Sequence, residues 1–331
     1  MDADRAAVRS AAIRFLARRV GAAAGVWWGV VTATFLLLHL VPGGTSLPFL
    51  SLRFSGADAL AFERQLGLTA PWWQQYLLWW WAVLHANLGT DWVTDLPVVQ
   101  LLAQALPYTL LLMGSALALT VAGGLGLAAW AVLRPRSFWA RAVKAFSRLG
   151  PAFPDFWIGS LLLWAAARWL PALPAGGTGI GDGGLAAVPL HLALPVATLV
   201  LAQTPFWTRL WFVRLSETLR APYVLAAQAR GLNARRLLWG EALPAAWPPL
   251  VALLGAQGIP ALVSGAVVVE SIFNWPGMGR LVWQAAEAHD LPLVLGAVLT
   301  TAAVTVCGAL LTDVWVLLRD PRLRRPWQGE A

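Results

Sequence analysis

Charged residues are scarce in this chain. They make up 12% of its 331 residues, against about 25% in ordinary soluble domains. Apolar residues make up 59% and include all 21 tryptophans, which is more apolar surface than the interior of a water-soluble domain of this size can hold. The composition therefore excludes an ordinary soluble enzyme or binding module and predicts that lipid surrounds much of the chain.

Cysteine and the common catalytic motifs are also almost missing. The single cysteine, Cys307, excludes a disulfide within one chain and a zinc site built from cysteines. No HExxH, GxSxG or phosphate-binding P-loop pattern occurs, so the chain itself shows no metalloprotease, serine hydrolase or ATPase site. The histidines are scattered and are interpreted as packing or interfacial residues rather than metal ligands: His39, His85, His191 and His289.

Long stretches without acidic or basic residues predict six membrane-spanning helices, because crossing ~30 Å of hydrocarbon takes about 20 apolar residues. The third stretch is short and reaches full length only if it extends back to Leu149, which places Asp155 inside the span. The fold class expected is all-α, a polytopic membrane protein. The six stretches are Val20–Val41, Leu96–Leu133, Phe156–Ala167, Gly183–Thr208, Ala242–Val269 and Leu291–Thr312.

Basic residues follow the alternation of the connections. The N-terminus, the connections after the second and fourth helices, and the C-terminal tail together carry 20 of the 24 Lys and Arg residues. Basic residues stay on the cytoplasmic side during insertion, so both termini are expected to be cytoplasmic. The net charge of +8 is thus explained by topology, and no nucleic-acid partner is expected. The four exceptions are Arg53, Arg64, Arg168 and Arg280.

The chain divides into three expected parts. Residues 1–95 hold the N-terminal segment, the first span and an outer loop with two interfacial helices, one over Ala57–Leu66 and one after Pro71. Residues 96–320 form a five-helix core that includes a cytoplasmic loop over 215–244, and residues 321–331 form a cytoplasmic tail. Indole rings prefer the headgroup region, so the tryptophan-rich second outer helix is interpreted as a membrane anchor, with a ligand-binding aromatic cage as the alternative.

Prolines, glycines and polar residues within the spans indicate a candidate solute pathway. Helix-disrupting residues such as Pro205 and Gly258 are tolerated in membranes where neighbours or water satisfy the freed backbone groups, although small residues also allow close helix packing. Both interpretations stay open. The polar residues that could line a pathway are Gln203, Thr204, Gln257, Ser264 and Asn274.

Two carboxyl groups fall within the predicted spans, at Asp155 and Asp313. Ionisable residues in membranes usually have a partner, and Arg148, Arg209 or Arg214 could supply one. A structural ion pair is favoured over a proton relay. Two other functions remain open on these two carboxyls alone, an ion-coupled secondary transporter and a multi-pass membrane enzyme that uses them as a catalytic pair.

The connection after the fourth helix predicts two short helices joined at a sharp angle. Pro222 can begin the first helix, and Gly231 can end it in the left-handed conformation. Asn233 can then cap a second helix, Ala234–Leu243, which Pro244 would end. Such a pair would form a rigid cytoplasmic projection on which a partner protein could act.

This connection resembles the EAA loop of ABC importer permeases, which provides the coupling helix for the ATPase subunit. Leu225 stands in the usual Glu position, and Glu241 occupies a usually aliphatic one. The pattern is most similar to the variant in the first permease subunit of dipeptide, oligopeptide and nickel importers. The residues expected to couple to the ATPase are Tyr223, Ala226, Ala227, Ala229, Arg230, Gly231, Leu243 and Pro244.

Other segments resemble the same family in the same order along the chain. The segment after helix five is the most specific of them, and Pro276 and the glycines predict a shaped re-entrant turn at an outer gate, with an exposed hairpin as the alternative. The gate residues expected are Glu270, Phe273, Trp275, Pro276, Gly277, Gly279 and Arg280. The remaining matches are His39–Gly43, Leu66–Tyr76, Leu88-Gly89, Leu106–Leu110, Phe156–Gly159, Asp313 and Asp320–Arg322.

The resemblance implies a non-catalytic permease subunit with the fold of type I ABC importers, in the bacterial inner membrane. It implies a second permease subunit that completes a heterodimeric pore, two cytoplasmic ATPase subunits that bind ATP and Mg, and an extracytoplasmic solute-binding protein. No cofactor is expected in this chain. The solutes implied are dipeptides, longer peptides, nickel or metal chelates, and the sequence does not distinguish among them.

Overall fold

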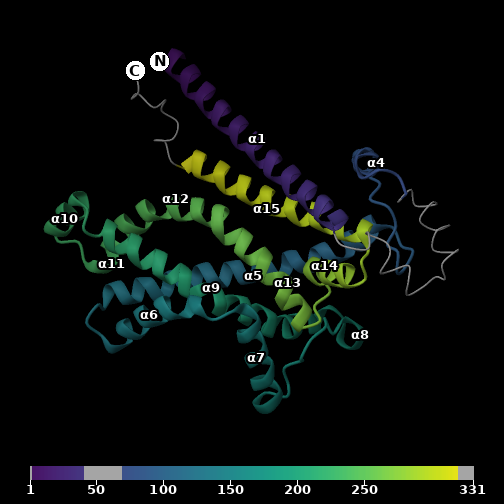
Figure 1. Ribbon diagram of the computed structural model, residues 1–331. Coiled ribbons are helices and arrows are strands. Elements are labelled where there is room, and N and C mark those ends of the chain that lie inside the picture. Colours follow the sequence, from purple (N-terminus) through teal and green to yellow (C-terminus); the bar gives the residue numbers. More distant parts are fainter. Residues whose placement is uncertain (1, 41–68, 320–331) are drawn as a thin grey trace.

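Helices account for the regular structure of the described part of the chain. The computed structural model describes residues 2–40 and 69–319, and within these ranges it contains helices and one isolated β-bridge, between Thr90 and Pro97. The predicted all-α class is confirmed. The helices are α1 (Asp2–Leu40), α4 (Trp72–Leu84), α5 (Val98–Leu133), α6 (Phe138–Leu149), α7 (Asp155–Trp169), α8 (Ile180–Gly183), α9 (Val188–Thr218), α10 (Pro222–Ala229), α11 (Ala234–Arg236), α12 (Leu243–Leu253), α13 (Ile259–Ile272), α14 (Met278–Glu287) and α15 (Leu291–Arg319) (Figure 1).

Parts of the His39–Gly43 and Leu66–Tyr76 matches lie outside the described residues, and three other sequence predictions lie outside them entirely. These three are the outer helix over Ala57–Leu66, the Asp320–Arg322 match and the cytoplasmic tail over 321–331.

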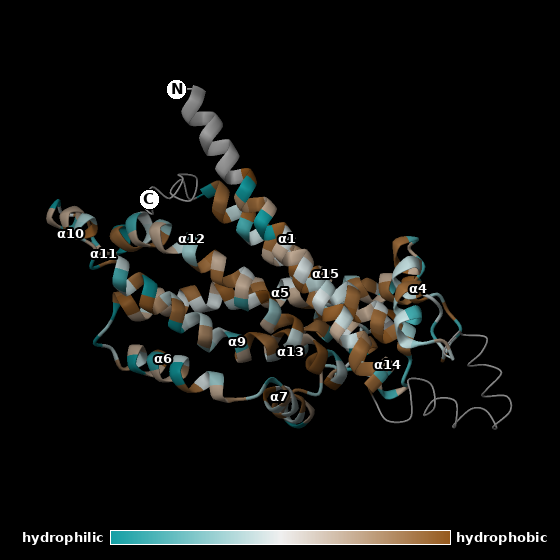
Figure 2. Cartoon of the chain, turned by 45° about the horizontal axis from the view of Figure 1, so that its top comes forward, coloured by the Kyte–Doolittle hydropathy of each residue, from teal (hydrophilic) through white to brown (hydrophobic). Residues whose placement is uncertain are grey.

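Five described helical stretches are long and apolar enough to cross a membrane. Apolar residues run along most of α5, α9, α13 and α15, whereas α6 carries more hydrophilic ones (Figure 2). The remaining expected span, the third in chain order, corresponds to α7. This helix has 15 residues, which is about 22 Å of helix. The five stretches are Ile13–Leu40, Val98–Leu133, Gly184–Thr218, Ala234–Ile272 and Leu291–Arg319.

The extension of the third helix back to Leu149 is wrong as one continuous helix. Helix α6 ends at Leu149, a 3₁₀ turn follows over Gly150–Ala152, and α7 begins at Asp155 after an extended Pro154. Pro151 in this turn and Pro154 after it cannot donate helix hydrogen bonds, and they restrict the residues before them. Asp155 therefore stands at the first position of α7, whereas the prediction placed it within a span.

The core lies along α5, α9 and α13. Helices α5 and α9 pack along each other, and Gly124 of α5 permits the close approach, because a Cβ atom there would lie 3.1 Å from the Cβ of Trp207. A large cluster that includes Leu112, Leu199 and Phe273 fills the space among these helices and α7. A second cluster, around Trp207, Trp211 and Leu250, joins α5 and α9 to α12.

The first and last long helices also lie side by side (Figure 1). The indole N–H of Trp27 donates a hydrogen bond to the carbonyl oxygen of Leu299 at 2.9 Å. Arg19 lies 3.5 Å from the carboxylate of Asp313. The partner of Asp313 is therefore Arg19 and none of the three arginines suggested by the sequence, because the packing of α1 on α15 brings together residues almost 300 positions apart.

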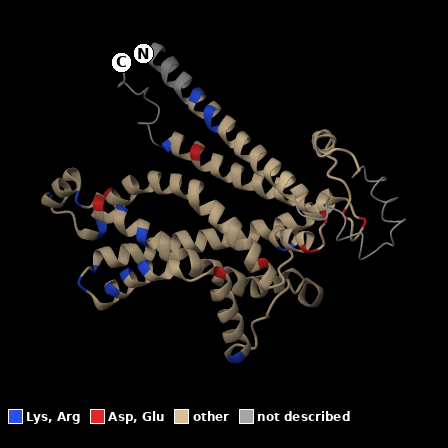
Figure 3. Ribbon diagram, in the orientation of Figure 1, with Lys and Arg blue, Asp and Glu red and all other residues tan. Residues whose placement is uncertain are grey.

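The two ends of the molecule differ in charge. Described Lys and Arg residues gather near α6, near α10 and α11, and on the first part of α1 (Figure 3). Helices α4, α8 and α14 lie toward the opposite end (Figure 1). Trp72, Trp73 and Trp81 of α4 are exposed. We refer to the end with α10 as the basic end and to the end with α14 as the α14 end.

A pair of buried carboxyl groups joins two connections at the α14 end. Asp290, which precedes α15, accepts hydrogen bonds from the main-chain N–H groups of Leu293, at 2.8 Å, and Trp92. Asp91 accepts from the N–H and hydroxyl of Thr94. Both carboxyl groups are buried. Burial raises the pKa of Asp290 to about 7, and the neighbouring Asp91 carboxyl adds to the rise.

The stability of this corner is predicted to depend on pH. Because the pKa of Asp290 in the folded chain is above its ordinary value of 3.8, the stability that its protonated form contributes is complete below about pH 4 and is lost as the pH rises through about 7. We expect the Tm in detergent to fall between about pH 5.5 and pH 8. Asp290→Asn, which cannot ionise, should flatten this dependence, whereas Asp95→Asn, at an exposed carboxyl nearby, should not. An unchanged pH profile in the Asp290 variant would contradict this assignment.

Candidate functional site

The last turn of α13 carries a fully buried carboxylate, that of Glu270. Its Oε1 accepts a hydrogen bond from the hydroxyl of Thr109 at 2.7 Å. Its Oε2 accepts the main-chain N–H groups of Gly279 at 2.6 Å and Arg280 at 3.1 Å. These N–H groups belong to the first turn of α14, where unpaired donors and the helix dipole favour a negative charge. Glu270 therefore anchors the start of α14 to the end of α13.

Thr109 connects this anchor to α5. Its hydroxyl donates to Glu270 and accepts the main-chain N–H of Met278 at 2.7 Å. Beside it, the indole N–H of Trp275 donates to the carbonyl oxygen of Tyr108 at 3.0 Å. Two segments that the sequence singled out separately, Leu106–Leu110 and Glu270–Arg280, are thus in direct contact.

The turn between α13 and α14 depends on one residue with left-handed backbone geometry and on two glycines that leave no room for a side chain. Asn274 has a φ of 51°, in the left-handed region. A Cβ atom at Gly277 would collide with the carboxyl group of Glu270, and one at Gly279 would collide with the backbone of Val267. Phe273 and Trp275 are fully buried. In the single chain the segment is therefore a packed turn and not an exposed hairpin.

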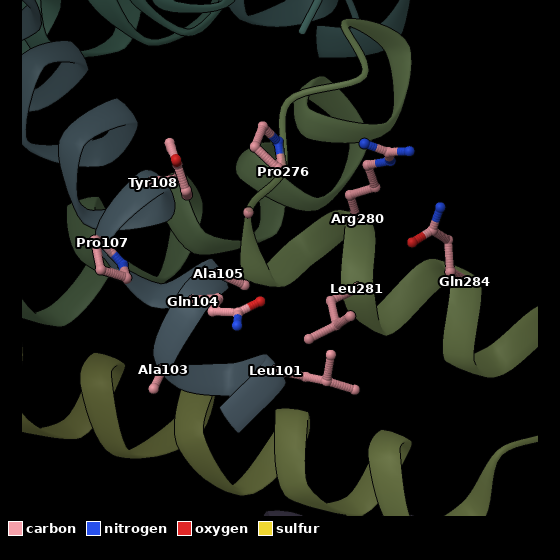
Figure 4. Close-up of a pocket in the computed structure, with 11 residues that line it drawn as sticks. Leu101, Ala103, Gln104, Ala105, Pro107, Tyr108, Pro276, Arg280, Leu281 and Gln284 are labelled. Carbon is pink, nitrogen blue, oxygen red and sulfur yellow. The ribbon is translucent and has the colours of Figure 1, made fainter. Parts of the chain in front are cut away.

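A cavity of about 660 Å³ lies between the start of α5 and this turn. Gln104 and Tyr108 line it from α5, and Arg280 and Gln284 line it from α14 (Figure 4). Pro276 also lines it, from the turn itself. The volume is in the range of small-molecule sites. The sequence analysis identified Arg280 and Pro276 but not the two glutamines, which carry no motif of their own.

The candidate pathway residues have mixed environments. Gln257 and Ser264 are exposed in the single chain. They stand seven positions apart, about two helical turns, so they lie on the same face of the continuous helix formed by α12, the segment Leu254–Gly258 and α13. Gln257 lies in a π-helical segment, Leu254–Gly258, a feature that is frequent at functional sites. Gln203 is half-buried, Thr204 is buried and Asn274 is exposed.

The two carboxyl groups that the sequence analysis placed within spans do not meet. Asp155 lies against α13, where a Cβ atom at Gly265 would approach its carboxylate to 2.6 Å. Asp313 is paired with Arg19 on the α1–α15 side. Among the described residues, no hydrogen bond or ion pair joins the two carboxyls, so the geometry offers no support for a catalytic pair.

The expected projection is present at the basic end. Helix α10 begins with Pro222, and Gly231 follows it with a φ of 91°. The side chain of Asn233 accepts the main-chain N–H of Arg236 at 2.9 Å, so the predicted cap is present. Within the projection, Ala227 packs with Val224 and Leu237. The residues left exposed by α10 and the position after it are Pro222, Tyr223, Leu225, Ala226, Gln228, Ala229 and Arg230.

The predicted end of the second short helix at Pro244 is wrong. After α11 the chain continues through a π-helical segment, Leu237–Ala242, directly into α12, with Pro244 in the first turn of α12. The wider π turn directly before Pro244 changes the hydrogen-bond pattern, and such local π adjustments allow an apolar helix to continue through a proline. The projection is therefore continuous with the helix that leads to Glu270.

The hydroxyl of Thr109 is predicted to hold the packed turn in place. Thr109→Val keeps the shape of the side chain but leaves Glu270 and the Met278 N–H each without one hydrogen-bond partner, which should lower the free energy of unfolding by about 1–2 kcal/mol. The matched control is Thr120→Val, in the same helix, where the buried hydroxyl has no hydrogen-bond partner in the described structure. Thermal unfolding and amide exchange of residues 275–282 would show the effect. Equal shifts in both variants would contradict it.

Comparison with known proteins matches the chain to transport components. The family described as binding-protein-dependent transport system inner membrane component matches residues 120–325. A probable peptide ABC transporter permease, y4tP of Sinorhizobium fredii (strain NBRC 101917 / NGR234), is 32% identical over 313 residues, 94% of this chain and 99% of that protein.

Two further relatives cover nearly the whole chain. The oligopeptide transport system permease AppB of Bacillus subtilis (strain 168) is 29% identical over 93% of this chain and 98% of its own length. The dipeptide transport system permease DppB of Escherichia coli (strain K12) is 28% identical over 94% of this chain and 99% of its own length. With the family match, which covers more than half of the residues, these similarities show that the chain belongs to the family of binding-protein-dependent transport system inner membrane components.

Proposed function

We propose that this chain is one of two permease subunits of an ATP-driven peptide importer. Family membership supports the transport role, and the observation that carries the proposal is the exposed face of α10 on a projection continuous with a candidate span. The relatives are named for peptide, oligopeptide and dipeptide transport. Peptides are therefore the solute class we propose, in preference to nickel or metal chelates.

In this proposal the projection receives the movement of the ATPase subunits. Tyr223 and Leu225 expose apolar side chains beside Arg230, a combination suited to a groove on a partner protein. Two ATPase subunits bind ATP and Mg, and the different affinities of ATP for two global states drive the switch. A second permease subunit completes the pore, and an extracytoplasmic binding protein delivers the peptide.

A continuous helical path links the projection to the Glu270 anchor. It runs from Ala234 through α12 to Ile272, 39 residues, or about 58 Å of helix. Because Glu270 holds the first turn of α14, a rotation of this rod at the basic end is transmitted to the packed turn at the other. We propose that this turn forms the outer gate.

The proposed topology places the basic end and both termini in the cytoplasm. We predict that a cysteine introduced by Arg236→Cys in a Cys307→Ala background is labelled by an impermeant maleimide only after the cells are opened. A cysteine introduced by Glu287→Cys, on α14, should be labelled in intact spheroplasts. The reverse pattern would overturn the orientation.

The complex itself provides the direct test of the proposed function. Purification of the tagged chain from native membranes should recover ATPase subunits. Vesicles that contain the complex and its binding protein should transport peptide only when ATP is present on the side of the membrane that carries the ATPase subunits. Uptake driven by an ion gradient without ATP would instead favour a secondary transporter.

Coupling is predicted to depend on the turn at Gly231. A side chain at its φ of 91° is strained by about 1–2 kcal/mol, so Gly231→Val should displace α10 and abolish peptide-stimulated ATP hydrolysis and uptake, with normal insertion. The control is Gly184→Val, with a φ of 62° and open space around its Cβ position. Equal losses in both variants, or full activity in the Gly231 variant, would argue against this coupling role.

A substitution on the exposed face gives a cleaner version of this test. Tyr223→Ala removes an exposed side chain and should lower coupled ATPase activity without a change in Tm. Ala227→Asp is less informative, because Ala227 is buried within the chain itself and its substitution would also disrupt the projection.

A further inference from the structure

The cavity between α5 and α14 contains an arginine with few partners. One terminal nitrogen of Arg280 donates to the carbonyl oxygen of Asn274 at 3.3 Å. A guanidinium group has five N–H donors, and among the described residues no carboxylate lies within ion-pair distance of this one. Most of its hydrogen-bonding capacity is thus open to a ligand.

The position of Arg280 is fixed although its side chain is not paired. Its own main-chain N–H donates to the buried Glu270 carboxylate, so the first turn of α14 holds its Cα in place. Basic residues are rare on the non-cytoplasmic side of membrane proteins. Arg280 is one of only four Lys or Arg residues outside the basic segments of this chain. A fixed, half-buried cation at the mouth of a cavity is therefore a candidate anion contact.

The rest of the lining determines what kind of anion fits. Gln104 on the α5 wall and Gln284 on the α14 wall (Figure 4) offer both amide donors and acceptors, as a main-chain peptide group requires. Leu101 and Leu281 add apolar surface. A small inorganic anion would use neither the leucines nor the 660 Å³ of volume, whereas a short peptide with a free C-terminus would use all of these groups.

We propose that this cavity is a peptide subsite in which Arg280 binds the C-terminal carboxylate of the solute, with Gln104 and Gln284 in contact with its adjacent peptide groups. The proposal rests on the peptide-import function and goes beyond it by naming the chemical group that the permease itself recognises. The planar guanidinium can engage both carboxylate oxygens. Its partial exposure keeps the contact weak, so that the peptide can also leave.

The experiment compares two forms of one peptide in vesicles that contain the intact complex and its binding protein. Ala-Ala-Ala with a free C-terminus and its C-terminal amide are supplied at concentrations that saturate the binding protein, whose affinity for each is measured separately. We expect the wild type to import the free acid about tenfold faster than the amide, the order of effect of a charge-assisted contact that is partly exposed.

Arg280→Gln should remove this preference by slowing uptake of the free acid to the rate of the amide. Co-purification of the variant with the ATPase subunits at the wild-type level shows that the variant assembles. Arg280→Lys should retain part of the preference. The matched control is Arg168→Gln, at the far end of α7, which should keep the wild-type ratio.

The remaining outcomes separate the two proposals. If wild-type vesicles import both peptides but Arg280→Gln keeps the ratio of the rates, the carboxylate subsite is wrong and the import function stands. Equal losses for both peptides in Arg280→Gln would show that Arg280 maintains the turn and binds no carboxylate, which also overturns the subsite. If the wild-type complex imports neither peptide with ATP, the import function and the subsite are both wrong.

Discussion

A carboxylate that is buried within a membrane-spanning helix must find hydrogen-bond donors, and this requirement organises one end of the molecule. Glu270 meets it with two main-chain N–H groups of α14 and the hydroxyl of Thr109. To supply those donors the chain has to reverse direction directly after α13, and it has to do so against α5. The sharp turn, the small residues in it and the contact between segments about 160 positions apart all follow from this need.

In the proposed mechanism, the same anchor links the projection at the basic end to the α14 end. A helix transmits movement along its axis only if both of its ends are held, and here the hydrophobic cluster of Val224, Ala227 and Leu237 holds one end while the Glu270 carboxylate holds the other. In the proposed mechanism both contacts are needed, because a helix that is held at one end only would not pass a movement to the other.

Much of this arrangement could be predicted from the sequence, because its signals are local. The long uncharged stretches gave the helices, Pro222, Gly231 and Asn233 marked the limits of α10 and its turn, and the unusual density of glycine and proline after α13 indicated a shaped segment. The signals failed where distant packing or a non-α hydrogen-bond pattern decides. Nothing in the sequence around Arg19 indicates that Asp313 is its partner. Pro244 is typical of a helix end, and only the π turn before it shows that the helix continues. Gln104 and Gln284 become candidate binding residues only because α5 and α14 form the two walls of one cavity.

The two π-helical segments determine how the ends of the rod face each other. Each occupies a stretch, Leu237–Ala242 and Leu254–Gly258, in which an extra residue is accommodated relative to a regular α-helix, and one residue corresponds to about 100° of rotation around the helix axis. Removal of a single residue from either segment would therefore restore a regular α-helical turn and leave α10 and Glu270 close to their present relative orientation. Removal of a residue from an α-helical part of the path would instead turn α10 by more than a quarter of a circle relative to Glu270, although the helix would remain apolar and long enough to span. The π segments are thus the places where the length of this helix can change by one residue with the least change in how its two ends face each other.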